Sequence, residues 1–231
     1  MKRFYKDARP VETAGGWTVA LDGKPIRTPA KAAFVAPVEA VAEAAAEEWR
    51  AQGERVLPPS MPVTKAVNTA IDRTGPEYDG VVEAVAAYGG ADLLCYRAEA
   101  PEALRARQAE GWDPLLAWAE DAHGARLRTT TGVMHALQPE ASLVELAGAV
   151  RGHDAFELTA LYDLVALSGS LVIGLAVSAG RLAPPDAWAV SRIDETWQEE
   201  QWGVDAEAAE TAARKAEEFA AAARFLRLLR G

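Results

Sequence analysis

The sequence has little of what metal sites, disulfide frameworks and nucleotide sites require. Among its 231 residues there is one cysteine, Cys95, and there are three histidines that are scattered along the chain. A lone cysteine cannot form an internal disulfide, which indicates a reducing compartment, and the histidines have no metal-ligand spacing. Neither a glycine-rich dinucleotide fingerprint nor a phosphate-binding loop occurs. We therefore expect neither a metal ion nor a cofactor.

Positive charge is also scarce. The chain has 24 lysines and arginines against 34 aspartates and glutamates, which gives a formal net charge of −10 and a pI near 4.9. Binding to nucleic acid or to an anionic membrane needs a basic face, so the charge argues against both partners. The opening residues, MKRFYKDARP, lack the apolar run of a signal peptide. We expect a soluble intracellular protein.

Long hydrophobic runs are limited to one stretch, LVALSGSLVIGLAVSA at 164–179. It is shorter than the roughly 20 apolar residues that a membrane span needs, so we expect no membrane insertion. Gly169, Ser170 and Gly174 are small enough to let another helix approach closely. We interpret the stretch as a helix buried on all sides within a helical domain. Because its serines lie inside a helix and not on a sharp strand-to-helix turn, a nucleophile role is disfavoured.

Turn signals and apolar periodicity divide the chain into two parts. Asp22–Gly23 is a two-residue hairpin signal between extended runs, and a helix is predicted over 37–52. A cluster of prolines follows, and beyond it most segments have helical periodicity. The prediction is an α+β fold. Residues 1–58 form a small N-terminal antiparallel sheet with one helix, and residues 59–231 form a larger all-helical domain, an orthogonal bundle.

The helices predicted in the second part span residues 63–72, 77–88, 101–123, 142–151, 156–179, 185–201 and 207–230. Pro114 is a possible interruption of the long helix 101–123. Residues 92–96 fit either a strand or a helix, and residues 126–132 are rich in threonine and indicate an extended segment or a loop. The terminal helix is rich in alanine and has high intrinsic helix propensity.

One stretch near the end, SRIDETWQEEQWGVDAE at 191–207, combines tryptophans with carboxylates. At 100° per residue, five residues gather on one side of the predicted helix and its end: Trp188, Arg192, Glu195, Glu199 and Trp202. A partner surface uses aromatic rings for contact area and charges for selectivity. The alternative is a helix buried on both sides, with its carboxylates paired to arginines. Periodicity leaves both open, and nothing indicates a pocket that would make these carboxylates catalytic.

Motifs in order along the chain resemble a single family. They are KRFY at 2–5, GWTVALDGK at 16–24, RTP at 27–29, EW at 48–49, MPVT at 61–64, NTAID at 68–72, DLLCYR at 92–97, WDPLL at 112–116 and SRIDE at 191–195. Each motif alone is modest, but the ordered set is specific. The chain is similar to the chaperone family that assembles the catalytic sector of F-type ATP synthase by holding its alpha subunit.

The resemblance implies a protein without catalytic activity of its own. Such a protein binds the unassembled alpha subunit and keeps it from aggregating until beta subunits replace the chaperone. Eukaryotic members are mitochondrial and carry a transit peptide, so we expect a bacterial, cytoplasmic relative here and a monomer when free. A general protein-interaction or holdase module without alpha specificity is the alternative. An enzyme with a carboxylate site is a third, disfavoured reading.

The resemblance also suggests which residues bind the client. Glu195 stands at the acidic position of the family's carboxyl-terminal motif, so it is the first candidate for client binding. The accompanying candidates are Asp194, Glu199, Trp188 and Trp202. Other motif residues are expected to be structural. We predict that Trp49 packs in the core, that Asn68 and Asp72 mark a hydrogen-bonded domain junction, and that Trp112 and Asp113 lie at a helix join which Asp113 caps.

Overall fold

The computed structural model of the chain describes residues 2–132 and 134–231. The described residues form two compact units. The first contains the residues up to Tyr78 together with Asp154–Ala160 and Ala221–Gly231, and the second contains Asp79–His153 and Leu161–Ala220. The boundary expected between residues 58 and 59 lies within the first unit, and the division into domains 1–58 and 59–231 stays a prediction.

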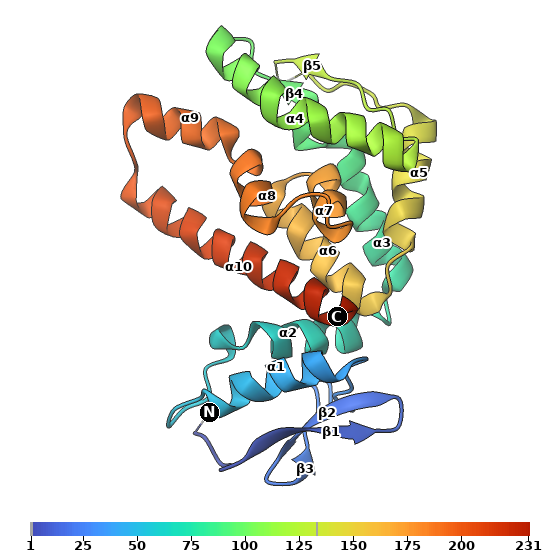
Figure 1. Cartoon of the computed structure of the whole chain (residues 1–231), viewed down its shortest axis with the longest axis vertical. Coiled ribbons are helices and arrows are strands. Elements are labelled where there is room, and N and C mark those ends of the chain that lie inside the picture. The colour runs from blue at the N-terminus through green and yellow to red at the C-terminus, as the bar shows by residue number, and fades with distance from the viewer. Residues whose placement is uncertain (1, 133) are drawn as a thin grey trace. The chain divides into compact units, whose positions relative to one another are not determined.

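The first unit contains a three-stranded antiparallel sheet in the order β1-β2-β3 (Figure 1). The strands are β1 (Ala8–Thr13), β2 (Gly16–Leu21) and β3 (Lys24–Pro25). Asp22 and Gly23 connect β2 to β3 with φ angles of 48° and 81°. Two central residues with positive φ give the backbone twist that a two-residue hairpin needs. The hairpin predicted from Asp22–Gly23 is therefore confirmed.

A buried carboxylate joins the first two helices, α1 (Glu39–Arg50) and α2 (Pro62–Thr69). Glu48, on α1, accepts the backbone N–H groups of Val63 at 2.6 Å and of Thr64 at 2.8 Å. These are N–H groups of the first turn of α2, which have no partner within their own helix. Burial raises the pKa of the Glu48 carboxyl. The short helices η1 (Pro58–Ser60) and η2 (Ala70–Thr74) flank α2.

The remaining elements are mostly helical, as predicted. They are α3 (Tyr78–Ala86), η3 (Ala87–Ala91), η4 (Leu93–Cys95), α4 (Glu102–His123), α5 (Glu140–Arg151), α6 (Ala155–Ser168), α7 (Leu171–Ser178), α8 (Pro184–Ser191), α9 (Ile193–Trp202) and α10 (Ala206–Arg230). The part predicted to be all-helical also contains a short parallel pair of strands, β4 (Tyr96–Arg97) and β5 (Thr130–Thr131). The α+β prediction is confirmed. Within the described residues, every helix is too short or too polar to cross a membrane.

The apolar stretch 164–179 forms the centre of the second unit, but as parts of two helices. Gly169 ends α6 with a φ of 72°, and the Ser170 Oγ accepts the N–H of Ile173 to cap α7 at 3.0 Å. All eight residues of α7 are buried. A Cβ at Gly174 would lie 2.5 Å from a methyl carbon of Val165, so α6 and α7 are in close contact there. Burial on all sides is confirmed for α7, whereas in the rest of the stretch Ala166 and Ala179 are exposed.

Asp92 is a fully buried carboxylate beside α7. It accepts the N–H groups of Leu94 and Val172, each at 3.0 Å. Burial raises its pKa. Burial also raises the pKa of the neighbouring Cys95 thiol to about 12, and the charge of Asp92 adds to this. Because the thiolate is the reactive form, Cys95 is a poor nucleophile.

Candidate functional site

The tryptophan-rich stretch near the end is two helices and not the single predicted helix 185–201. Arg192, between α8 and α9, has φ −113° and ψ 16°, which lies outside the α-helical region. The Ser191 Oγ donates a hydrogen bond to the carbonyl of Trp188 at 2.7 Å in the last turn of α8. Trp188 therefore belongs to one helix, while Glu195, Glu199 and Trp202 belong to the next.

Arg192 nevertheless brings several of the predicted residues together. Its guanidinium lies 3.1 Å from a carboxylate oxygen of Glu195 and 3.6 Å from one of Glu199. The same guanidinium lies 5.8 Å from the centre of the Trp188 ring. The Arg192 side chain is 22% exposed and that of Glu195 is 48% exposed. Arg192 thus fixes the direction of two carboxylates that remain open to solvent.

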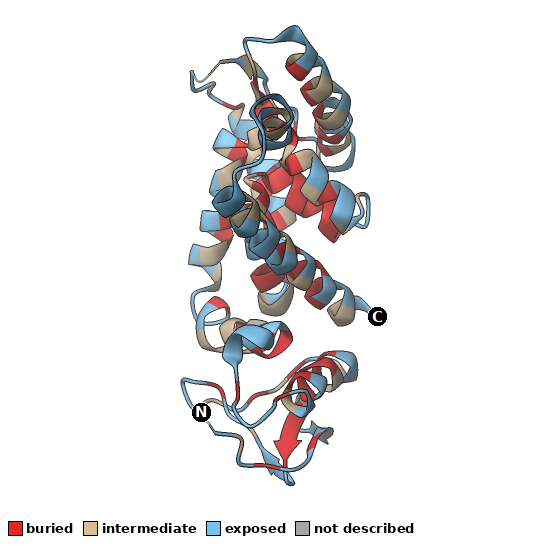
Figure 2. Cartoon of the chain, turned by 90° about the vertical axis from the view of Figure 1, so that its left-hand side faces the viewer, coloured by how far each residue is buried: buried red, intermediate tan, exposed pale blue. Residues whose placement is uncertain are grey.

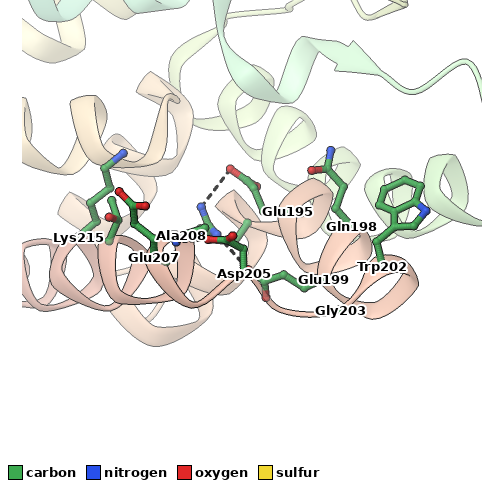
Figure 3. Close-up of a pocket in the computed structure, with 12 residues that line it drawn as sticks. Glu195, Gln198, Glu199, Trp202, Gly203, Asp205, Glu207, Ala208 and Lys215 are labelled. Carbon is green, nitrogen blue, oxygen red and sulfur yellow. Dashed lines mark hydrogen bonds and ion pairs between the residues drawn. The ribbon is translucent and has the colours of Figure 1, made fainter.

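These carboxylates line a cleft between α9 and the first part of α10 (Figure 3). Gly203, with a φ of 88°, ends α9, and the chain turns back into α10 after Asp205. The cleft has a volume of about 650 Å³. Its lining residues are Arg192, Glu195, Gln198, Glu199, Trp202, Gly203, Asp205, Glu207, Ala208, Thr211, Ala212 and Lys215. We call this site the α9–α10 cleft. Four carboxylates in it face two cations.

The most exposed large apolar groups in this region stand where α9 ends. Trp202 is 78% exposed and Val204 is 67% exposed. Figure 3 shows Glu195, Gln198 and Trp202 pointing to the same side of α9. An indole ring open to water beside carboxylates is costly to hydrate and is typical of a contact surface for another macromolecule.

Asp194 lies apart from the cleft, although it is next to Glu195 in the chain. Its Oδ1 accepts a hydrogen bond from the Gln108 Nε2 at 2.6 Å. Gln108, on α4, is 1% exposed, and its Oε1 accepts the N–H of Ala98 at 2.8 Å. The geometry gives Asp194 a part in holding α9 against α4. Its predicted role in client binding stays a prediction.

Trp188 is likewise outside the cleft lining. Its ring lies 5.7 Å from the ring of Phe219, which is 1% exposed and belongs to α10. The contact fixes α8 against α10 within the second unit. Of the five predicted client-binding residues, the structure therefore places Glu195, Glu199 and Trp202 in the cleft.

The pair at the predicted helix join has other partners. Trp112 is fully buried and donates its indole N–H to the carbonyl of Val190 at 2.8 Å. Asp113 accepts a hydrogen bond from the Arg97 guanidinium at 2.7 Å. The helix join predicted at Pro114 is wrong, because α4 runs from Glu102 to His123 with Pro114 inside it. Proline removes one helical hydrogen bond, and the buried side chains of α4 hold the helix despite that loss.

The other predicted structural residues lie in the first unit. The Trp49 ring, half-buried on α1, lies 5.5 Å from the ring of Tyr5, and the Tyr5 hydroxyl donates to the Trp49 carbonyl at 2.6 Å. Asp72 accepts the Thr28 hydroxyl at 2.6 Å and the N–H of Ala30 at 3.0 Å. The buried Oδ1 of Asn68 has no hydrogen-bond partner among the described residues. A domain-junction role for Asn68 and Asp72 stays a prediction.

Sequence reasoning missed the α10 side of the cleft. The lining residues from α10 are Glu207, Ala208, Thr211, Ala212 and Lys215. They recur at spacings of three and four, which is the signal that could have found them. The alanine content of this helix by itself indicates only high helix propensity.

The cleft does not resemble a small-molecule site. Such sites are enclosed, whereas this cleft is open to solvent and is bordered by four carboxylates and two cations. Across residues 2–132 and 134–231, no group of three or more His, Cys, Asp or Glu side chains is placed to hold a metal ion. The arrangement suits contact with another chain.

Comparisons with known proteins agree with that reading. The family described as ATP12 chaperone protein matches residues 2–120, which is just over half of the chain. The chain belongs to the ATP12 chaperone family. This confirms the resemblance drawn from the ordered motifs to the assembly chaperones of ATP synthase. The ATP12 family and its solved neighbours are described as chaperones and not as enzymes.

Solved structures extend the likeness to the ATP12 family over the whole chain. The crystal structure of Atp12 from Paracoccus denitrificans is 47% identical, with a TM-score of 0.96 over 99% of this chain and 98% of that one. A single-residue mutant of Atp12p from the same organism is 46% identical, with a TM-score of 0.96 over 99% and 97%. The Atu1473 protein from Agrobacterium tumefaciens, which is described as a chaperone, is 44% identical, with a TM-score of 0.95 over 99% and 86%.

Proposed function

We propose that this ATP12-family chaperone binds the unassembled alpha subunit of F-type ATP synthase and protects it until beta subunits replace the chaperone. The observation that carries the proposal is the α9–α10 cleft, where an exposed Trp202 stands beside a row of carboxylates. A ring subunit without its neighbours exposes apolar interface that would otherwise pair with itself. A chaperone for it needs a complementary surface that yields to the proper neighbour.

Glu195 is the residue on which we base the proposal. Its carboxylate is held by Arg192 at 3.1 Å and yet is 48% exposed. An ion pair of this exposure adds little to folding stability, about 1 kcal/mol at most. A fixed and open carboxylate is instead suited to meet a charge on another protein.

The net negative charge of the cleft lining indicates which charge the client surface has. With four carboxylates against two cations, the cleft favours a locally basic surface. A nucleotide-site face, which must neutralise phosphates, is one such surface on an alpha subunit. Charges at the rim of an interface also raise the association rate and suppress wrong partners.

The test is a pull-down with isolated alpha and beta subunits. We expect the wild-type chaperone to retain alpha, and we expect Glu195→Gln to weaken and Glu195→Lys to abolish retention. The thermal melt followed by circular dichroism should be nearly unchanged in both variants, because the Glu195 side chain is half exposed. Glu83→Lys is the matched control, since Glu83 is an exposed residue of α3 and the charge change is the same.

Two results would contradict this proposal. Retention of neither subunit by the wild-type chaperone would exclude alpha as the client. A large loss of stability in Glu195→Gln would show that Glu195 is a structural residue and not a contact residue.

The second candidate is a general holdase. The open form of the cleft and the exposure of Trp202 favour it, because neither restricts binding to one shape of partner. A general holdase would suppress the aggregation of unrelated unfolded proteins as well as that of alpha. Specific protection of alpha in the same light-scattering assay would reject this candidate.

A further inference from the structure

The first half of α10, residues 206–218, is a helix whose side chains are all exposed or half-buried (Figure 2). Burial begins at Phe219, which is 1% exposed. Most helices in proteins are stabilised by packing of one face. This segment is built mainly from alanine, glutamate, lysine and arginine, which have the highest helix propensities. It can therefore stay helical while one face has no partner.

The open face of α10 and the open face of α9 line the same cleft. On α9 the lining residues recur every three or four positions from Glu195 to Trp202, a length of about 10 Å at about 1.5 Å per residue. On α10 the corresponding stripe runs from Ala208 to Lys215, about 10 Å. Figure 1 shows α9 and α10 extending from their link toward the same side of the molecule and moving apart along their length. Both helices thus expose a row of side chains to the same open cleft. The position that a third helix would take between the two rows is empty.

The side chains of the α10 stripe are small where a third helix would approach. Ala208 and Ala212 are four residues apart and lie on one face, with Gly203 at the end of α9. Helices that pack through side chains have axes about 8–10 Å apart, and small residues favour the shorter distance. An extended peptide binds by backbone hydrogen bonds to the edge of a sheet. Neither wall of the cleft offers such an edge, because both walls are helices whose backbone N–H groups are already bonded.

Charge decides which kind of helix fits. Arg192 is already engaged by Glu195 and Glu199. The Asp205 Oδ1 accepts the N–H of Ala208 at 2.8 Å, and Glu207 adds a second carboxylate at the start of α10. Lys215 is the remaining cation of the lining. A second copy of this chain, with a net charge of −10, would be repelled on average. A cationic helix is attracted.

We propose that the α9–α10 cleft binds one amphipathic, cationic helix of the client. Its aliphatic stripe packs on Trp202 and on the alanines of α10, and its lysines or arginines pair with Glu195 and Glu199. This is helix-in-groove recognition, in which residues at i, i+3, i+4 and i+7 give the anchors. The identity of the client rests on the proposed function, whereas the chemistry of the bound segment is tested separately.

The probe is a synthetic helical peptide of Ala, Leu and Lys with the leucines on one stripe and the lysines beside it. A second peptide has the same composition in scrambled order, and a third has Glu in place of Lys. The full-length chaperone is labelled with 5-fluorotryptophan, and among its seven tryptophans the fluorine signal of Trp202 is assigned with Trp202→Phe. We expect the amphipathic Lys peptide to shift the Trp202 signal saturably, and the other two peptides to leave it in place.

Three variants locate the binding. Glu195→Lys should weaken the amphipathic Lys peptide about ten-fold or more, while Glu83→Lys, with the same charge change on exposed α3, should weaken it less than about two-fold. Ala212→Phe fills the cleft without changing any charge and should abolish the shift. Equal effects of Glu195→Lys and Glu83→Lys, or equal binding of the scrambled peptide, would mean non-specific charge attraction and would overturn the proposal.

The outcome is separable from that of the pull-down. Retention of alpha together with an unmoved Trp202 signal would reject helix-in-groove binding and leave the proposed function intact. A saturable Trp202 shift together with retention of neither subunit would support the cleft chemistry and reject alpha as the client.

Discussion

Two helical segments of the second unit, α7 and the first half of α10, are held in opposite ways. All eight residues of α7 are buried, whereas residues 206–218 of α10 are exposed or half-buried throughout. In α7 the helix is fixed by the side chains around it, since its apolar residues gain by leaving water. In α10 the helix is maintained by its own propensity. The contrast separates a segment that serves the fold from a segment that is available to a partner.

The largest expected effect contrasts two tryptophans, Trp112 in the core of the second unit and Trp202 at the cleft. Trp112→Ala should lower the free energy of unfolding by about 3–5 kcal/mol, because it opens a cavity and leaves the Val190 carbonyl without its donor. Trp202→Ala should change it by less than about 0.5 kcal/mol. Urea unfolding followed by circular dichroism measures both. Similar losses in the two variants would break the contrast.

A smaller effect contrasts two helical glycines. Gly174→Ala should destabilise the protein by about 1–3 kcal/mol, because the new methyl group would lie 2.5 Å from a methyl carbon of Val165. Gly148→Ala, in α5, has open space around the new methyl group. It should stabilise by about 0.5–1 kcal/mol, since alanine loses less backbone entropy than glycine. An unchanged stability of Gly174→Ala in urea unfolding would contradict the close contact of α6 with α7, and destabilisation by Gly148→Ala would contradict the open space beside α5.

The smallest effect contrasts neighbours on α9. Asp194→Ala removes the acceptor of the buried Gln108 amide and should cost about 1 kcal/mol of folding stability. Glu195→Ala removes an exposed ion pair and should cost less than about 0.5 kcal/mol. Thermal melts of the two variants compare them directly. A larger loss for Glu195→Ala than for Asp194→Ala would reverse the roles that the geometry gives them.

Local chemistry explains the parts of the structure that could be predicted. The hairpin at Asp22–Gly23 depends on two adjacent residues that tolerate positive φ, and the burial of α7 and of most of the stretch before it follows from a run without charge. Predicted ends of α1, 37 and 52, differ from the observed Glu39 and Arg50 by two residues each. The spacing of Arg192 and Glu195 allows their ion pair within one turn of chain.

Other features could not be predicted because they depend on residues far apart in the chain. Periodicity over 185–201 predicts one helix, whereas the structure has two helices with a break at Arg192. At this break the Arg192 guanidinium contacts Glu195, Glu199 and the Trp188 ring. Pro114 suggests an interruption that packing of Trp112 and its neighbours overrides. The α10 residues of the cleft share a helical spacing, but their role becomes recognisable only when α9 lies opposite them.

The sequence by itself determined the family, the α+β class, the hairpin and the buried central stretch, since each depends on residue order or on neighbours within a few positions. Tertiary structure alone decided that Asp194 turns to Gln108, 86 positions away, while Glu195 turns to the cleft. It also decided that an alanine-rich helix lines the same cleft as Trp202. Two adjacent carboxylates are equivalent in an unfolded chain, and they differ only after folding places a buried amide beside one and water beside the other.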